Sequence, residues 1–245
     1  MDYKKYQFSW IQVAGVLLQA VLFTGIIAYL FYSSLCGMVF GPVLFVILMR
    51  RKKANCIAQR KRMLHGEFLD ALKIVSTSLM SGMSMENAWR EASKEMQVMH
   101  SKKSVIYREL EEMNHLVETN IPMEKVLIQF AYRSGVEDII SFAEVFEYGK
   151  RSGANWRKLI HDTTLRMEEK YETEKQIQIM LTEKKMEQKI MSVIPLGMIL
   201  FLRVTSKDYM DVLYGNPFGI ICMTICLMGY GVALYMAERI MKVQV

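Results

Sequence analysis

The sequence predicts an all-α membrane protein with four transmembrane helices in two pairs, separated by a helical-bundle domain in the cytoplasm. Both ends of the chain are apolar, whereas 46 of the 56 charged residues (31 Lys and Arg plus 25 Asp and Glu) fall between Arg50 and Lys189. Apolar residues inside that charged region recur at helical spacing. The predicted domains are an N-terminal membrane hairpin (1–49), a basic juxtamembrane segment (50–62), a cytoplasmic helical domain (63–189) and a C-terminal membrane helix pair (190–245).

The N-terminal hairpin is predicted from a long stretch without charge. Phe8 to Met49 contains 42 residues and no Asp, Glu, Lys or Arg. One membrane crossing needs about 20 residues, so two crossings with a short turn near Ser33 and Ser34 fit this length. A cleaved signal peptide is not expected, because the stretch is too long and no small-residue cleavage pattern follows it.

The basic segment that follows sets the expected orientation. "RRKKANCIAQRKR" (Arg50 to Arg62) carries seven basic residues and no acid, whereas residues 63–189 carry 18 basic and 21 acidic residues. A nucleic-acid-binding domain is expected to spread its basic residues over a folded face. A basic run against the end of an apolar segment instead marks the cytoplasmic side of a membrane. We therefore expect both termini and the charged middle in the cytoplasm, and no nucleic acid as a partner.

The first two helices of the cytoplasmic domain are predicted from apolar spacing and from a glycine turn. The first carries Leu64, Phe68, Leu72, Val75 and Leu79. Gly82 is expected to end it in a left-handed C-cap, and Ser84 to cap the next helix, because glycine and serine favour these positions. The second helix carries an apolar face made of Met85, Ala88, Trp89, Ala92 and Met96.

Three further helices are expected before residue 150. The first covers about residues 102–118, the second runs from Pro122 to near Gly135, and the third covers about residues 138–148. The stretch "GKRSGAN" is expected to be a loop in which Gly149 and Gly153 break the helix.

The C-terminal membrane pair is predicted to begin with a long helix from the cytoplasm. Between Trp156 and Leu202 the only proline is Pro195, which is expected to kink the helix. Ile190 to Leu202 has only 13 uncharged residues, and it can span a bilayer if the flanking cations reach opposite interfaces. Phe218 to Met236 is a charge-free span of 19 residues.

Motifs for catalysis or cofactor binding are not found. The sequence has no P-loop, no glycine-rich dinucleotide loop, no HExxH and no CxxC. The histidines lack the spacing of metal ligands and are expected at the surface; they are His65, His100, His115 and His161. We therefore expect no enzyme activity, no cofactor and no metal.

The acidic residues of the predicted helix at 138–148 allow two interpretations. Helical spacing turns Glu137, Glu144 and, less closely, Glu147 away from its apolar face. They form either a solvated face or a docking face for a basic partner, which in the second case includes the nearby Lys150 and Arg151. Proton carriage is not expected, because these residues lie in the polar middle of the chain and not within a predicted span.

Three stretches together resemble the type II secretion system F family. They are "FLDALKIVSTSLMSGMSMENAW", "IPMEKVLIQFAYRSGVEDIISFAEVFEYGKRSGANW" and "EKKMEQKIMSVIPLGMILFLR". Their order, spacing and topology are most similar to those of the inner-membrane platform proteins of tight-adherence (Flp-type) pili. The second glycine turn of the family usually reads G-G, whereas this chain has "RSGAN".

The resemblance implies a non-enzymatic platform in the inner membrane, with both termini in the cytoplasm. Such a platform links a cytoplasmic secretion ATPase to pilin subunits and forms homo-oligomers or pairs with a sister platform protein. A membrane-anchored sensor or adaptor with a helical signalling domain is the alternative, but it predicts long heptad repeats, which the sequence lacks. A small transporter would require polar residues inside the spans, where almost none occur.

Overall fold

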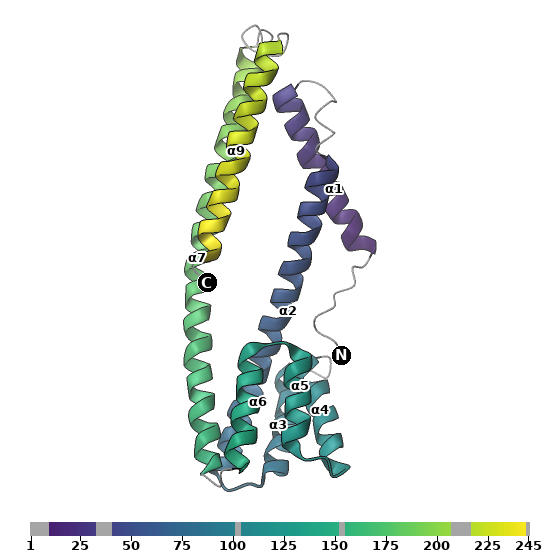
Figure 1. Cartoon of the computed structure of the whole chain (residues 1–245), viewed down its shortest axis with the longest axis vertical. Helices are drawn as coiled ribbons and strands as arrows, with labels where there is room; N and C mark the ends of the chain where they lie inside the picture. Colours follow the sequence, from purple (N-terminus) through teal and green to yellow (C-terminus); the bar gives the residue numbers. More distant parts are fainter. Residues whose placement is uncertain (1–9, 33–40, 101–103, 152–154, 207–216, 244–245) are drawn as a thin grey trace. The chain divides into compact units, whose positions relative to one another are not determined.

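The computed structural model describes residues 10–32, 41–100, 104–151, 155–206 and 217–243, and Figure 1 shows the course of the chain. Every regular element in these ranges is helical, which confirms the all-α prediction for the described residues. The chain forms two compact units. The bundle unit comprises Lys53–Thr173, and the apolar unit comprises Phe8–Lys52 with Glu174–Val245.

The helices of the described residues follow one another along the chain. In order they are α1 (Trp10–Ile27) with the π-helical turn η1 (Ala28–Tyr32), α2 (Gly41–Met80), α3 (Met85–His100), α4 (Val105–Glu118), α5 (Met123–Ser134), α6 (Glu137–Arg151), α7 (Trp156–Thr205) and α9 (Pro217–Val243). The basic segment predicted at 50–62 lies inside the continuous helix α2. The turn predicted near Ser33 lies outside the described residues.

The core of the bundle is aromatic and aliphatic. The Phe68 ring of α2 contacts the rings of Phe130 in α5 and Phe142 in α6, with centroids 5.7 and 5.8 Å apart. Trp89 of α3 is fully buried in the same cluster. These contacts join residues up to about 70 positions apart, and they hold α2, α5 and α6 around one centre.

Two glycines end helices of the bundle with positive φ angles. Gly82 has φ +95°; its N–H donates to the carbonyl of Leu79 at 3.1 Å, and the N–H of Met83 donates to the carbonyl of Ser78 at 3.0 Å. This pair of hydrogen bonds is the Schellman motif, which satisfies the last carbonyls of α2. Gly135 has φ +62° and ends α5. Glycine suits both positions because it has no Cβ to strain.

Gly149 differs from its prediction as a helix breaker. It lies inside α6, which continues to Arg151, and it is buried. A Cβ at this position would come within 2.6 Å of Cδ2 of Leu159 in α7. The glycine therefore permits close packing of two helices instead of ending one. Gly153, the second predicted breaker, lies outside the described residues.

One carboxylate in the bundle joins three helices. Asp138, in the first turn of α6, lies 2.6 Å from Nζ of Lys170 in α7 and 3.3 Å from Nε2 of His65 in α2. One helical turn before His65, Lys61 donates from Nζ to the carbonyl of Gly135 at 2.6 Å. The turn between α5 and α6 is thus attached to both α2 and α7 by charged groups.

The apolar unit supplies helices of membrane-spanning length. Among the described residues three helices are long and apolar enough to cross a bilayer: Val13–Phe31, Trp156–Thr205 through its C-terminal part, and Phe218–Ile240. The chain is therefore consistent with a membrane protein. The fourth predicted span is represented only by residues 41–49, the apolar start of α2, and is not established. α7 continues as one helix through Pro195.

The apolar unit has a small core of its own. Leu30 and Phe31 of η1 pack with Met223 of α9, and apolar residues of α7 and α9 surround them. In α7 and α9, which lie side by side in Figure 1, the hydroxyl of Tyr230 donates to the carbonyl of Ser192. Arg51 of α2 forms an ion pair of 2.5 Å with Glu238 of α9.

Candidate docking face of the helical bundle

The predicted docking residues lie on α6, and the buried side of this helix decides where they point. Ile139, Phe142, Ala143 and Phe146 are buried, so Glu137 and Glu144 are exposed on the opposite side. Glu137 and Asp138 occupy the first turn, and Lys150 and Arg151 occupy the last. Both placements suit the helix dipole, which favours acids at the N-terminus and bases at the C-terminus.

The two cations that were predicted in a loop instead belong to the last turn of α6. Arg151 pairs with Glu147 one turn earlier at 2.5 Å, and Lys150 pairs with Glu124 of α5 at 2.6 Å. Burial raises the pKa of Glu124, but the hydrogen bond and charge of Lys150, with the adjacent Arg151, lower it overall. The structure thus pairs Arg151 with Glu147 within α6, whereas Lys150 is paired with Glu124 of the neighbouring helix.

Two tyrosines, absent from the sequence prediction, complete the exposed face. Tyr148 of α6 and Tyr132 of α5 expose 73% and 57% of their surface. The hydroxyl of Tyr132 donates to Glu144 at 3.4 Å, and Tyr148 follows Glu144 by one turn. We call these three residues the Tyr–Glu patch. Tyr148 could have been found from sequence, because it falls out of register with the buried positions of α6.

The chemistry of the Tyr–Glu patch suits protein recognition. Tyrosine is enriched in protein–protein interfaces because its ring buries much area while its hydroxyl remains hydrogen-bonded. Carboxylates such as Glu137 and Glu144 at the edge of an interface steer the approach of a basic partner. Among the described residues, no group of three or more His, Cys, Asp or Glu side chains could hold a metal ion.

The histidines are not all at the surface, contrary to the prediction from sequence. His65 is buried beside Asp138, and its ring meets the ring of Tyr171 edge-on at 5.1 Å. His100 lies 3.2 Å from Asp70, and Nδ1 of His161 lies 2.9 Å from the hydroxyl of Ser76. The prediction for His65 was wrong because this face of α2 is covered by α6 and α7.

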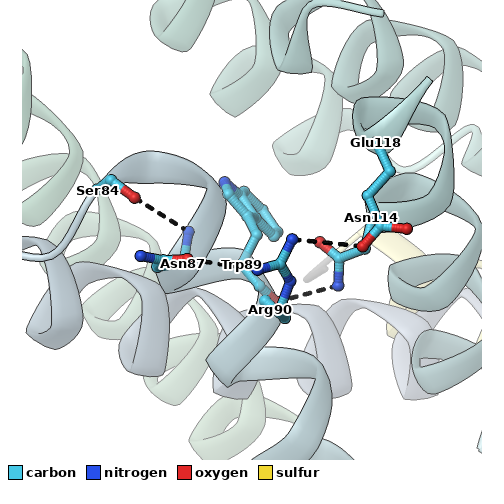
Figure 2. A network of polar contacts seen from close by, with 6 residues as sticks. All are labelled: Ser84, Asn87, Trp89, Arg90, Asn114 and Glu118. Atoms are coloured by element: carbon cyan, nitrogen blue, oxygen red, sulfur yellow. Dashed lines mark hydrogen bonds and ion pairs between the residues drawn. The ribbon is translucent and has the colours of Figure 1, made fainter. Parts of the chain in front are cut away.

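A polar groove of about 460 Å³ lies between α3 and α4. The sequence did not predict this groove. Figure 2 shows the lining residues Arg90, Asn114 and Glu118 with their partners. Arg90 contacts Glu118 at 3.3 Å and Asn87 at 3.5 Å, and Asn114 donates to the carbonyl of Trp89. Ser84 receives the N–H of Asn87 at 3.4 Å, as a capping serine does.

The groove holds no arrangement for nucleophilic or acid–base catalysis among its lining residues. Tyr107 donates to Glu111 at 2.5 Å, and this hydrogen bond, with burial and the negative charge of Glu111, raises the pKa of the phenol. The phenol therefore stays protonated at neutral pH. Arg90 of α3 and Glu118 of α4 pair with each other across the groove.

The comparisons with known proteins found no relative of this chain. The chain matches no family model, no curated protein and no solved structure.

Proposed function

We propose that the chain is a platform protein of a Flp-like pilus or type II secretion machine in the inner membrane. In this role it couples a cytoplasmic secretion ATPase to the assembly of pilin subunits and performs no catalysis itself. The observation that supports the proposal most is the course of two helices. α2 (Gly41–Met80) and α7 (Trp156–Thr205) each contribute to the charged bundle unit and to the apolar unit as a single helix.

Continuous helices suit the transmission of movement. At about 1.5 Å per residue, α2 and α7 are roughly 60 and 75 Å long. A helix of this kind is stiff along its axis because its internal carbonyls accept hydrogen bonds from the next turn, except at Pro195 of α7, which has no N–H to donate. Displacement of the bundle by a motor would therefore reach membrane-embedded segments through two elements without an intervening loop.

The proposed orientation places the bundle in the cytoplasm, because the basic residues at the ends of the apolar stretches favour that side. It can be tested by cysteine labelling of intact cells in a background without the natural cysteines. A probe at Ser206, at the end of α7, is expected to react with an impermeant maleimide. A probe at Ser141, which is exposed on α6, is expected to react only after the cells are opened. The opposite pattern would overturn this orientation.

The proposed contact with the ATPase is the Tyr–Glu patch together with Glu137. Lysine at Glu137 and Glu144 and serine at Tyr148 are expected to slow association of the full-length protein with the cognate ATPase by about tenfold or more, because these changes reverse the steering charge and remove the aromatic contact. Rising salt is expected to slow the wild-type association, because the Debye length, over which charges act on one another, shortens to about 8 Å near physiological ionic strength. Surface plasmon resonance with detergent-solubilised protein measures both effects.

A matched variant separates docking from general charge effects. Lysine at Glu86 and Glu95 and serine at Val98 make the same changes of charge and polarity on the exposed side of α3. This control is expected to bind the ATPase at the wild-type rate, and circular dichroism is expected to show the same helicity for all three proteins. Equal association rates for the patch variant and the wild type would mean that the face of α6 is only solvated.

A further inference from the structure

Three helices of the apolar unit, α2, α7 and α9, carry basic residues at a similar height along the helix axes. The Arg51–Glu238 ion pair joins α2 to the end of α9, and the Tyr230–Ser192 hydrogen bond joins α9 to α7. Glu238 lies eight residues, or about 12 Å, beyond Tyr230 in α9. Because α7 runs antiparallel to α9, the same distance along it from Ser192 leads to residue 184. We define the basic belt as Arg50, Arg51, Lys52, Lys184, Lys185, Lys189 and Arg239.

The basic belt has a net positive charge and lies where the apolar stretches of its helices end. Its seven cations are accompanied on the same turns by three acids, Glu183, Glu187 and Glu238, which leaves a net charge of +4. Arg50, Lys185, Lys189 and Arg239 are exposed. The apolar stretches begin or end directly beside these residues, at residues 41–49 of α2, 190–202 of α7 and 218–236 of α9.

The cation at the other end of the apolar stretch of α7 is engaged differently. The guanidinium of Arg203 lies over the ring of Tyr29, 3.8 Å from its centroid, and donates to the carbonyl of the same residue. Arg203 is thus held by Tyr29 of η1 in its own unit, whereas several cations of the basic belt face solvent. The two ends of the apolar stretches therefore differ in the positive charge that they present.

We propose that the basic belt is a binding surface for the headgroups of anionic phospholipids, such as phosphatidylglycerol, in the leaflet that faces the bundle. Arginine guanidinium groups match the paired oxygens of a phosphodiester, and lysine chains extend along apolar surface to reach it. The Arg51–Glu238 ion pair then has a structural part, because it links α2 to α9 at the level where Arg50 and Arg239 meet one headgroup layer. The inference needs no ATPase and stands apart from the proposed function.

The test measures the affinity of the full-length protein for tail-labelled phosphatidylglycerol and phosphatidylcholine in mixed detergent micelles. The wild type is expected to bind phosphatidylglycerol at least about tenfold more tightly. Glutamine at Arg50, Lys185 and Arg239, one residue from each helix, is expected to weaken phosphatidylglycerol binding by about 100-fold, since each cation near a membrane surface contributes roughly a factor of five. Binding of phosphatidylcholine is expected to stay unchanged.

Three controls identify the cause of such a loss. Glutamine at Lys94, Arg108 and Lys125, which are exposed on the bundle, removes the same charge and is expected to leave the lipid preference intact. Exchange of arginine and lysine at the three belt positions is expected to keep most of the preference, even if the glutamine variant fails to fold. Inorganic phosphate in excess is expected to displace little lipid. Equal affinity of the wild type for both lipids, equal loss in the bundle control, or full displacement by phosphate would each overturn the proposal.

Discussion

Replacing Phe68 with alanine is expected to lower the free energy of unfolding of the bundle by about 3–5 kcal/mol. Phe68 is completely buried, and its ring contacts both Phe130 and Phe142. The substitution removes the transfer energy of the ring, leaves a cavity, and ends two aromatic contacts that are worth about 0.5–1.5 kcal/mol each beyond their area. Because the three rings come from α2, α5 and α6, the surrounding helices cannot collapse into the space without giving up other contacts.

The unfolding can be followed through a natural reporter in the same core. Trp89 is fully buried, whereas Trp10 is almost fully exposed, so phenylalanine at Trp10 and Trp156 leaves one tryptophan that reports on the bundle. Denaturant titration of the full-length protein in detergent, read from Trp89 fluorescence, then gives the free energy. Alanine at Val98, which is 87% exposed, is the matched control and is expected to change it by less than about 0.5 kcal/mol. A loss below about 1 kcal/mol for Phe68→Ala would contradict the described core.

Replacing Arg133 with methionine is expected to destabilise the bundle by a similar amount, about 3–5 kcal/mol. Arg133 of α5 pairs with Glu109 of α4, whose side chain is only 5% exposed, and it also lies 3.2 Å from Glu112. Methionine fills much of the same volume but removes the guanidinium that faces the buried Glu109 carboxylate. The main loss is therefore the cost of a desolvated charge and not the loss of packing.

A double variant distinguishes these two causes. Glutamine at Glu109 together with methionine at Arg133 removes the buried charge as well as its partner, and it is expected to recover a large part of the lost stability. Lysine at Arg133 keeps the charge without the planar fork and is expected to fall between the wild type and methionine. If the double variant is no more stable than Arg133→Met, the effect comes from packing of the side chain.

Local periodicity was enough to predict the face of α6. Ile139, Phe142 and Phe146 recur at helical spacing, and the structure buries all three. The fate of Gly149 could not be predicted in this way, because it depends on Leu159, which reaches α6 from the next helix. A glycine that breaks a helix and a glycine that admits a neighbour look the same in a single sequence.

Only part of the candidate docking face could be predicted from the sequence, because some of its residues come from a second helix. Glu144 and Tyr148 share α6, so their relation follows from helix geometry, but Tyr132 reaches them from α5. The pairing of Lys150 with Glu124 likewise joins residues on separate helices. Spacing within one helix carries no information about which side chains a second helix will place beside it.

The membrane segments show which spans composition can predict and which it cannot. The charge-free stretches predicted the spans in α1 and α9, because about 20 successive residues without charge match the thickness of a bilayer and are rare in water-soluble helices. The span in α7 was predicted from only 13 uncharged residues, 190–202, together with flanking cations that can reach the interfaces. The second crossing of the N-terminal hairpin depends on where the chain turns, which composition alone does not fix. α2 becomes charged after only nine apolar residues of its described part.

Within the bundle, the carboxylate of Asp138 couples the rotation of α2 about its axis to the rotation of α7. Each carboxylate oxygen contacts a different helix: Oδ1 contacts Lys170 of α7, and Oδ2 contacts His65 of α2. Advancing α7 by one residue position turns it through about 100° and carries Lys170 out of reach. α6 can follow Lys170 only by drawing Asp138 away from His65. The two long helices are therefore bridged by one side chain, and rotation of either helix stretches its contact with Asp138.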